Sequence, residues 1–397
     1  MAFIVHCYDL LIKNGTVVDP VLGLNKKMDV GIYASRIADV FEPGSLPGKI
    51  CGHKVIDASG MYVVPGLVDG HVHVLPGLRF TYPIDELWKR GITACIDMGS
   101  QTSASFHRER HLIDEAPCMV NACLGLSNMA ETQGEIPRYA LLDQEVNLEK
   151  IQELFEVHGD VLVGIKVFIG HADSPGAELT HAVMKKARQV CDAVGCRMFV
   201  HVANPDVPLP ELIDYFHPGD NFTHTYNKGN ILDQDGHVYK EAWEAKKRGV
   251  IFDSARGSRN WSSEVAKAAF AEGFFPDVIT DDLTALSNDP QTSRLTVHMG
   301  ECMALGMSFE DVLLRTTSVP ASFMKGVEVG VKRGLPASLT ILDLQQGPHD
   351  FTDAFGEHYE GQTNIIPKAT IIKGKIMYNR SEERRVGKEC RSRWSPY

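Results

Sequence analysis

The feature that most restricts the fold of this 397-residue chain is a strand-then-helix rhythm that begins after Pro65. Short apolar segments that suit buried strands lie at 67–74, 93–99, 118–125, 162–170, 197–204, 221–227, 249–257 and 277–283. Helical stretches such as 179–195, 239–249 and 262–273 lie between them, and each ends in a glycine that suits a helix C-terminus. Successive strand–helix units of this kind predict a (β/α)8 TIM barrel, which we place at residues 66–334.

The two ranges that flank the barrel, 1–65 and 335–379, have a different pattern of short alternating strands and turns. Asn14–Gly15 is the commonest dipeptide of two-residue β-hairpin turns, and Ser59–Gly60 is a second turn signal. We expect both ranges to join in one small β-sandwich domain built from the two chain ends. The predicted fold class is therefore α/β, a TIM barrel with a small β-sandwich domain.

Residues 380–397 read as the in-frame translation of a sequencing-library adapter, and we treat them as a non-native tail. The tail carries six Lys/Arg and three Asp/Glu, so the formal charge of −11 for the whole chain becomes −14 without it. An acidic chain without a basic, aromatic-rich patch repels phosphate backbones and anionic lipids. We therefore expect neither a nucleic-acid nor a membrane partner.

Eight cysteines remain outside the tail, and their spacings match neither zinc-finger nor thioredoxin patterns. We expect these cysteines to be reduced thiols. The first residues lack the basic segment and long apolar run of a signal peptide, and no later run reaches the length of a membrane span. These features predict a cytoplasmic protein.

Two histidines, His71 and His73, follow an apolar run in the segment PGLVDGHVHVLPG. Side chains two residues apart on a strand share a face, so Asp69 and both histidines are predicted to face the barrel axis. The neighbouring valines, Val68 among them, are predicted to face the helices. Two imidazoles at the C-terminal end of a barrel strand can bind one metal ion, although two hydrogen-bonded core histidines also fit this short pattern.

Lys166 interrupts the fourth strand, which is otherwise apolar. A buried, unpaired ammonium group would cost several kcal/mol, so burial favours the neutral amine. A neutral amine can react with carbon dioxide to give an anionic carbamate, which could bridge two metal ions. An ion pair with a barrel carboxylate is the alternative.

His201 and His224 end the next two strands, and Phe199 and Phe222 precede them by two residues on the same predicted face. Each histidine alone is more often a core residue than a ligand. A lone loop histidine, His171, follows the fourth strand and is left unassigned.

The eighth strand offers two carboxylates, Asp281 and Asp282. If Ile279 packs on the helices, the two-residue alternation of a strand directs Asp282 inward and Asp281 outward. The ordered set His-x-His, Lys, His, His and Asp at the ends of successive strands is far more specific than any one of its members.

In this order the residues resemble the binuclear branch of the amidohydrolase superfamily, which contains dihydroorotases, hydantoinases and deacetylases. Segments similar to its deacetylase-like metallohydrolases are GITACIDMGS, VGIKV, THTYNKGN, RGVIFD, GFFPDVITDDL and LGMSFEDVLLRTTSVPA. The resemblance implies two divalent metal ions, most simply Zn²⁺, held by His71, His73, Lys166, His201, His224 and Asp282. It also implies that carbon dioxide converts Lys166 to N6-carboxylysine, which bridges the metals together with a hydroxide.

The resemblance further implies a hydrolase that cleaves an amide or ester bond of a small acylated, carboxylate-bearing compound through the metal-bridging hydroxide. Asp282 would be the catalytic residue that transfers the proton. A cyclic amidase of the dihydroorotase or hydantoinase kind, a mononuclear deaminase and a non-catalytic scaffold relative are alternatives. We also expect a homo-oligomer.

The chain departs from these relatives at three positions. Relatives often carry arginine at Phe168, and histidine at Arg256 and at Thr284. The guanidinium of Arg256 is expected to bind a substrate carboxylate, unless it forms an ion pair with a neighbouring acid instead.

Overall fold

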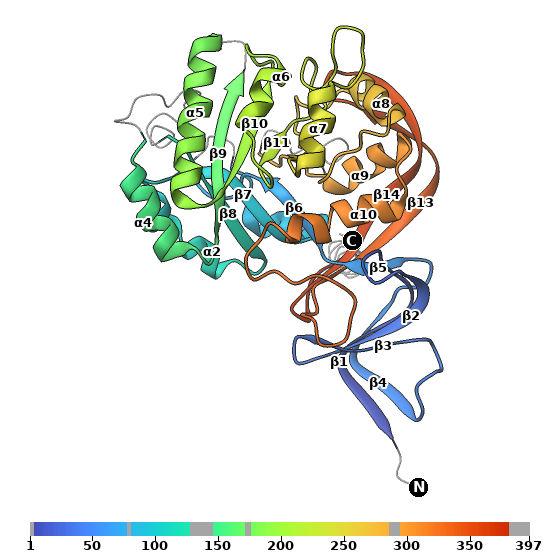
Figure 1. The fold of residues 1–397 in the computed structure, drawn as a ribbon. Coiled ribbons are helices and arrows are strands. Elements are labelled where there is room, and N and C mark those ends of the chain that lie inside the picture. The colour runs from blue at the N-terminus through green and yellow to red at the C-terminus, as the bar shows by residue number, and fades with distance from the viewer. Residues whose placement is uncertain (1–3, 78–80, 128–145, 171–175, 286–293, 381–397) are drawn as a thin grey trace, which may run out of the picture.

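The computed structural model describes residues 4–77, 81–127, 146–170, 176–285 and 294–380. Figure 1 shows a parallel sheet covered by helices and, below it, the strands of the N-terminal region. Two long C-terminal strands run from those N-terminal strands along one side of the helix-covered part. The predicted tail lies outside the described residues, apart from Arg380.

A seven-stranded parallel sheet forms the helix-covered part of the chain. Its strands follow chain order: β6 (Leu67–Val72), β7 (Ile92–Thr102), β8 (Met119–Gly125), β9 (Leu162–Gly170), β10 (Arg197–Ala203), β11 (Asn221–Thr223) and β12 (Ile251–Phe252). Nearly all of their residues are buried, as expected when helices cover one face and a packed interior the other.

The predicted eighth strand at 277–283 is not a regular strand, but its backbone bonds to both outer strands of the sheet. Val278 forms a parallel bridge with Asp253 beyond β12, and Leu283 forms one with Val72 of β6. The N–H of His73 also donates to the carbonyl of Leu283 at 2.9 Å. This closure of the parallel sheet is consistent with the predicted TIM barrel.

The helical stretches predicted at 179–195, 239–249 and 262–273 are present as α5 (Ala177–Val194), α7 (Lys240–Arg248) and α8 (Ser263–Ala271). The other helices are η1 (Ile84–Arg90), α1 (Phe106–Glu109), α2 (His111–Glu115), α4 (Leu148–His158), α6 (Leu209–Leu212), η2 (Ile213–Tyr215), α9 (Leu295–Ala304), α10 (Phe309–Arg315) and α11 (Ser318–Ala321). Gly195 and Gly249 end α5 and α7 with φ of 73° and 99°, the left-handed conformation that glycine adopts without strain. Among the described residues, no helix is long and apolar enough to cross a bilayer.

The strands from both chain ends share one eight-stranded sheet. They are β1 (Val5–Asp19), β2 (Leu24–Tyr33), β3 (Arg36–Phe41), β4 (Lys49–Asp57), β5 (Tyr62–Pro65), β13 (Leu339–Thr352), β14 (His358–Ile372) and β15 (Lys375–Asn379). β13 joins the N-terminal strands through antiparallel pairing with β5. The two facing sheets of a sandwich, and the domain limits 1–65 with 335–379 and 66–334, stay predictions.

The hairpin turn predicted at Asn14–Gly15 is wrong. β1 continues through both residues, and its pairing with β2 shifts register between Ile12 and Gly15. Asn14 has a φ of 64°, and its N–H donates to Oδ1 of Asp29 at 2.8 Å. A left-handed Asn before Gly suits a β-bulge as well as a tight turn, so the dipeptide alone does not distinguish them.

Candidate metal centre

β6 carries His71 to one end of the parallel sheet, and His73 follows directly after the strand; both histidines are buried. The predicted facing of their neighbours is partly wrong: Val68 packs with Phe199 in the sheet interior, whereas Val72 packs in the large cluster that includes the helices. The pairing of β6 with β7 shifts register between Asp69 and Val72, and such a bulge reverses the alternation of side chains.

Asp69 also stays apart from the two imidazoles. Its Oδ1 accepts the backbone N–H groups of His71 and Asp281, at 3.1 and 3.3 Å. Its carboxylate therefore supports the backbone next to the histidines.

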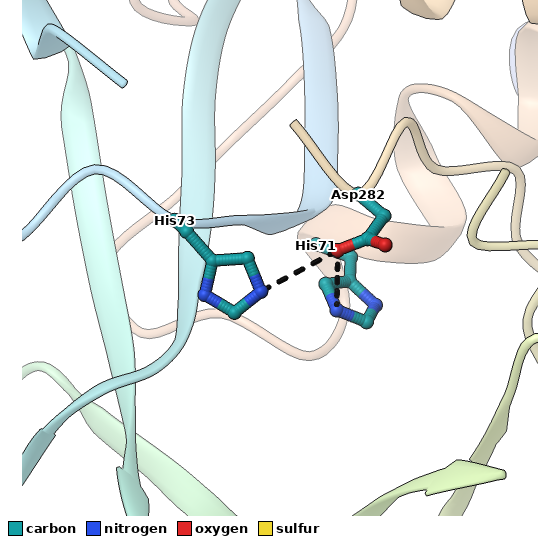
Figure 2. A group of neighbouring side chains, drawn as sticks. All are labelled: His71, His73 and Asp282. Atoms are coloured by element: carbon teal, nitrogen blue, oxygen red, sulfur yellow. Dashed lines mark ion pairs between the residues drawn. The ribbon is translucent and has the colours of Figure 1, made fainter. Parts of the chain in front are cut away.

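Of the two carboxylates at 281 and 282, Asp282 lies with the histidines. Its Oδ1 is 3.4 Å from Nε2 of His71 and 3.4 Å from Nε2 of His73. Figure 2 marks both ion pairs with dashed lines. The side chain of Asp282 is 14% exposed, whereas Asp281 is completely buried. Ile279 packs with the helix-side cluster and Val278 with the interior cluster, which is the alternation assumed in the sequence prediction.

The spacing of these three side chains fits a metal ion as well as it fits long hydrogen bonds. A distance of 3.4 Å exceeds the 2.7–3.2 Å of ordinary N–H···O hydrogen bonds. Tetrahedral zinc ligands bonded at about 2.0–2.2 Å lie roughly 3.3–3.6 Å from one another. His71, His73 and Asp282 are also the described group whose ligand atoms all lie within 4.8 Å of one another.

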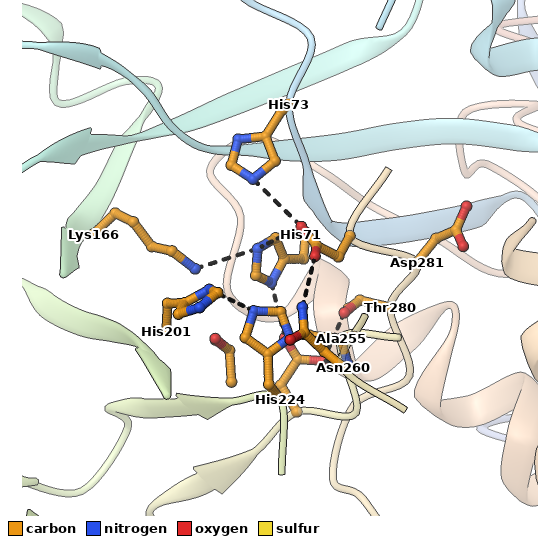
Figure 3. Close-up of polar contacts among 12 residues, drawn as sticks. His71, His73, Lys166, His201, His224, Ala255, Asn260, Thr280 and Asp281 are labelled. Carbon is orange, nitrogen blue, oxygen red and sulfur yellow. Dashed lines mark hydrogen bonds and ion pairs between the residues drawn. The ribbon is translucent and has the colours of Figure 1, made fainter. Parts of the chain in front are cut away.

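The remaining predicted ligands lie beside this group (Figure 3). Nζ of Lys166 is 3.2 Å from Nε2 of His71. Nε2 of His224 is 2.7 Å from Nδ1 of His201, and the ring centroids of His71 and His224 are 5.5 Å apart. The structure thus brings all the side chains of the predicted ligand set together.

His224 reaches this position by a route that strand alternation does not predict. β11 ends at Thr223, and His224 has a left-handed φ of 63°. Phe222 packs against Phe252 in the helix-side cluster, with ring centroids 5.6 Å apart. The prediction that Phe222 and His224 share a face is therefore wrong, because the chain leaves the strand between them.

The burial of the site sets the charge states that metal ligands need. Burial lowers the pKa of Lys166 to about 8, so a neutral amine is accessible near neutral pH. Burial and the nearby charge of Lys166 hold the pKa of His71 well below its ordinary value, which keeps the imidazole neutral. Burial opposes ionisation of Asp282, but the hydrogen bond from His73 and the charges of His224 and Lys166 keep its pKa below the ordinary value.

Three acceptors orient the imidazoles, and the sequence interpretation missed them. Nδ1 of His71 faces Oδ2 of Asp253 at 3.4 Å, and Nδ1 of His224 lies 2.6 Å from the carbonyl of Ala255. A proton on either Nδ1 leaves Nε2 as the lone-pair atom that faces the site, an arrangement typical of metal-bound histidine.

The third acceptor belongs to His73. Its Nδ1 is 3.4 Å from the Ser100 hydroxyl, which itself donates to Asp97 at 2.8 Å. Asp97 and Asp253 lie within the predicted strands 93–99 and 249–257, so an acidic residue inside an otherwise apolar strand was the available signal for both.

Asp282 has its own support in the loop after β12. The amide of Asn260 donates to Oδ2 of Asp282 at 3.4 Å. Gly257 has a φ of +52°, and a Cβ there would lie 2.5 Å from the same oxygen. Gly257 therefore allows the loop to approach the carboxylate closely. No sequence pattern predicted the contact of Asn260 or of Gly257 with Asp282.

Arg256 lies in a buried ion pair, the alternative that the sequence left open. Its Nε and Nη2 donate to the two carboxylate oxygens of Glu301 at 2.8 and 2.9 Å. Further donations reach the carbonyls of Gly257 and Thr352. Since the guanidinium is only 2% exposed, its geometry gives no support to the predicted contact with a substrate carboxylate.

Other positions contribute less to the site. Phe168 stacks beside His201, with ring centroids 5.3 Å apart, and His171 lies outside the described residues. A surface cavity of about 760 Å³ lies elsewhere, between α4, α5 and residues 322–325. It contains none of the candidate ligands.

The comparisons with known proteins agree with this geometry. The amidohydrolase family matches residues 62–377, which is more than half of the chain and includes every candidate ligand. A deacetylase from Enterococcus faecalis is 28% identical over 389 residues, which cover 94% of this chain and 100% of the relative.

Two solved structures extend the comparison to three dimensions. A crystal structure of an adenine deaminase aligns with a TM-score of 0.80 at 26% identity, over 94% of this chain and 100% of that one. A crystal structure of a dihydroorotase aligns with a TM-score of 0.81 at 25% identity, over 93% of this chain and 99% of that one. The family resemblance inferred from the sequence is thereby confirmed: the chain belongs to the amidohydrolase family of hydrolytic enzymes.

Proposed function

We propose that this enzyme is a binuclear metal-dependent hydrolase that cleaves the amide or ester bond of a small acylated compound, as a deacetylase does. The observation that carries the proposal is the convergence, at one end of the parallel sheet, of the buried side chains of His71, His73, Lys166, His201 and His224 with the partly exposed carboxylate of Asp282. Such a set is costly in a core unless it binds something, because each polar group loses its hydration there.

The residues divide into two neighbouring groups. His71, His73 and Asp282 would hold one ion, and His201 with His224 would hold the other. Lys166 lies beside the first group and would join the two. When bound, two such ions polarise a carbonyl group and lower the pKa of a water molecule. The imidazole-rich set favours zinc.

Lys166 would join the groups as its carbamate. The lone pair of the neutral amine attacks the carbon of CO₂, a C–N bond forms, one C–O π pair moves to oxygen, and the nitrogen releases a proton. The product is an anionic carboxylate with two oxygen donors. The lowered pKa of Lys166 supports this step, because only the neutral amine has the lone pair.

Asp282 would carry the proton during hydrolysis. Its carboxylate is ionised and partly exposed, and Asn260 holds its second oxygen. In this position it can accept a proton from the attacking water and deliver it to the leaving nitrogen or oxygen. The proposal does not rest on Arg256, and it does not include the carboxylate group expected on the substrate. The acyl group has its support in the deacetylase relative.

Metal content tests the proposal. We expect two divalent ions per chain, and Lys166→Ala should lower this number to one while leaving the fold intact. Added acetate or formate should restore part of the second site. Lys246→Ala, which removes another largely buried lysine beside Asp277, is the matched control and should keep both ions. One ion per chain with full activity would contradict the binuclear proposal.

A cyclic amidase is the second candidate, because the dihydroorotase structure covers nearly the whole chain. A deaminase is a third, given the equally extensive likeness to an adenine deaminase. A screen of N-acyl amino acids, O-acyl hydroxy acids, cyclic imides and aminopurines would separate the three. If only the cyclic imides are hydrolysed, the cyclic amidase proposal replaces the deacetylase proposal. If only the aminopurines react, the deaminase proposal replaces it.

A further inference from the structure

The eight described cysteines are free thiols, and six of them form three pairs in which the two thiol groups are in hydrogen-bonding contact. The pairs are Cys7 with Cys51, Cys95 with Cys118, and Cys191 with Cys196. Two thiols in contact can become a disulfide if the backbone geometry fits and an oxidant can reach one of the sulfur atoms.

Access to solvent separates the first pair from the other two. Of the eight described cysteines, only Cys7 is exposed, and its partner Cys51 is half-buried. Both members of the second pair are buried, and so is Cys191 of the third. Because oxidation of a cysteine depends on its exposure, an oxidant in solution should react first at Cys7.

The backbone geometry of this pair suits a disulfide. Cys7 and Cys51 are register partners in the parallel pairing of β1 with β4. Tyr8 and Ile50 pack in one cluster on one face of these strands, so the alternation of side chains places both cysteines on the other face. Neighbouring strands lie about 4.7–4.9 Å apart, within the range of about 4.4–6.8 Å that separates the Cα atoms of most disulfides.

The position of the pair gives such a bond a structural effect. Figure 1 shows β4 and the first half of β1 extending away from the helix-covered part of the chain. Among the described residues, β1 is the only strand that pairs with β4. A bond between Cys7 and Cys51 would close a covalent loop that contains β2 and β3. Closing a long loop restricts the unfolded chain and thereby stabilises the folded one.

We propose that Cys7 and Cys51 form a modification site at which hydrogen peroxide produces a disulfide that fastens β4 to β1. The Cys7 thiolate attacks one peroxide oxygen, the O–O bond breaks, and a sulfenic acid forms while hydroxide leaves. The Cys51 thiolate then displaces a second hydroxide from that sulfur, and the S–S bond forms. The two protons released by the thiols convert both hydroxides to water, so two electrons pass from the thiols to the peroxide.

The reactive species is the thiolate, which is scarce in this pair at neutral pH. The hydrogen bond with Cys51 raises the pKa of the Cys7 thiol. Oxidation should therefore be faster at alkaline pH, and the experiment is best done there.

Thiol counting and peptide mapping test the proposal on the full chain with Cys390→Ser, which leaves eight cysteines. The folded protein is treated with hydrogen peroxide, and catalase then removes the excess. Denatured afterwards, the monomer should show six thiols instead of eight, and a non-reducing digest should contain Cys7 linked to Cys51. Dithiothreitol should restore all eight thiols while it is itself oxidised to a cyclic disulfide.

Three controls belong to this experiment. Cys7→Ser and Cys51→Ser each remove one sulfur of the pair, and neither variant should form a disulfide within the monomer. Cys95 and Cys118 serve as the internal control for access, because their thiols are also in contact but buried. They should stay reduced in the folded chain.

Thermal melting measures the effect on the fold. The oxidised chain should melt several degrees above the reduced chain, because the disulfide closes a long loop. Cys7→Ser treated with peroxide in the same way should show no such increase.

Three outcomes would overturn the proposal. The first is that Cys7 stays reduced, or is oxidised, without a bond to Cys51 of the same chain. The second is that Cys95 and Cys118 form a disulfide as readily as the exposed pair. The third is an oxidised chain that melts below the reduced one, since the bond would then strain the strands. None of these measurements involves catalysis, so the results do not depend on the proposed enzymatic activity.

Discussion

Two clusters of buried polar side chains lie close together in this enzyme, and they differ in how their hydrogen-bonding groups are satisfied. In the first, Arg256 donates to both oxygens of Glu301, and Nδ1 of His298 lies 2.8 Å from one of them. Nε2 of His298 in turn lies 2.9 Å from the Ser254 hydroxyl. Every member of this Arg256–Glu301 cluster has a protein partner of suitable charge.

The second cluster is the candidate metal centre, where imidazoles and a lysine gather around one carboxylate. Nε2 of His71 and of His73 converge on a single oxygen of Asp282, each at 3.4 Å. Nζ of Lys166 lies 3.2 Å from the Nε2 of His71, an imidazole that burial keeps neutral. The difference teaches that burial of polar residues alone does not indicate a site, and that the convergence of several atoms of the kinds that bind metal is what motivates the metal-site proposal.

The largest effect that separates the clusters is expected at Asp282. Asp282→Asn removes the proton acceptor and weakens the ligand group, so turnover should fall by roughly 10²–10⁴-fold or more. The fold should persist, because the amide has the same shape. Measurement of turnover and of bound metal on the same sample checks this result.

Asp281→Asn is the control for that prediction. Asp281 is completely buried, and its pKa is raised to about 7 by burial. A neutral amide should therefore leave turnover nearly unchanged. If Asp281→Asn stops turnover while Asp282→Asn does not, the assignment of Asp282 rather than Asp281 to the site is wrong.

The next largest effect concerns the Arg256–Glu301 cluster. Glu301→Gln leaves the buried guanidinium without its counter-charge, which should cost about 3–5 kcal/mol of unfolding free energy. Turnover per folded molecule should change little, because Glu301 does not touch the candidate ligands. Denaturant unfolding and active-site titration separate the two quantities.

The pH dependence of this cluster has a definite sign. Burial opposes ionisation of Glu301, but the charge of Arg256 holds its pKa below the ordinary 4.5. The stabilisation is therefore complete above the ordinary value and is lost as the pH falls through the lower folded value. The difference in unfolding free energy between the unmodified chain and Glu301→Gln should therefore become smaller only at acidic pH. A double variant, Arg256→Met with Glu301→Gln, should be more stable than Glu301→Gln alone.

A smaller effect is expected at Gly257, where the two clusters adjoin. Gly257→Ala places a methyl group against Oδ2 of Asp282 at a positive φ, so overpacking should cost about 1–3 kcal/mol, shared between stability and catalysis. Gly273→Ala also has a positive φ, of 88°, but no atom lies within 4 Å of its Cβ. If both variants lose activity equally, backbone strain rather than contact with Asp282 is responsible.

The comparison also shows how much the sequence can predict. The spacing along successive strands predicts that the candidate ligands meet at the strand ends, and the structure brings their side chains together there, because parallel strands share one C-terminal edge. Their role as metal ligands stays a prediction. Alternation from Ile279, which packs toward the helices as assumed, names Asp282 as the carboxylate that lies with the histidines. Asp282 itself has a left-handed φ of 49°, so regular strand geometry does not hold as far as this residue. Helix limits follow closely from glycine and from the apolar periodicity.

Alternation fails where the backbone departs from a regular strand. A bulge in β6 places Val68 and Val72 on opposite faces of the sheet. His224 has a left-handed φ, so it does not share a face with Phe222 as predicted. The partner of Arg256 could not be predicted, because Glu301 lies 45 residues away on α9 and only the packing of that helix brings it near. Contacts between distant segments depend on the assembled fold, which no local pattern contains.

The smallest effect that we predict distinguishes Lys166 from an ordinary lysine. Its pKa is lowered to about 8 by burial, whereas an exposed lysine stays near 10.5. The neutral fraction of Lys166 should rise about tenfold per pH unit below 8 and then level off. At constant CO₂ pressure, the rate of carbamate formation in metal-free protein should follow that curve, and ¹³C NMR of protein under ¹³CO₂ would measure it. Lys166→Arg, which cannot form the carbamate, is the control. A rate that keeps rising to pH 10 would mean that Lys166 pairs with a carboxylate strongly enough to cancel the effect of burial, and the site would then resemble the Arg256–Glu301 cluster.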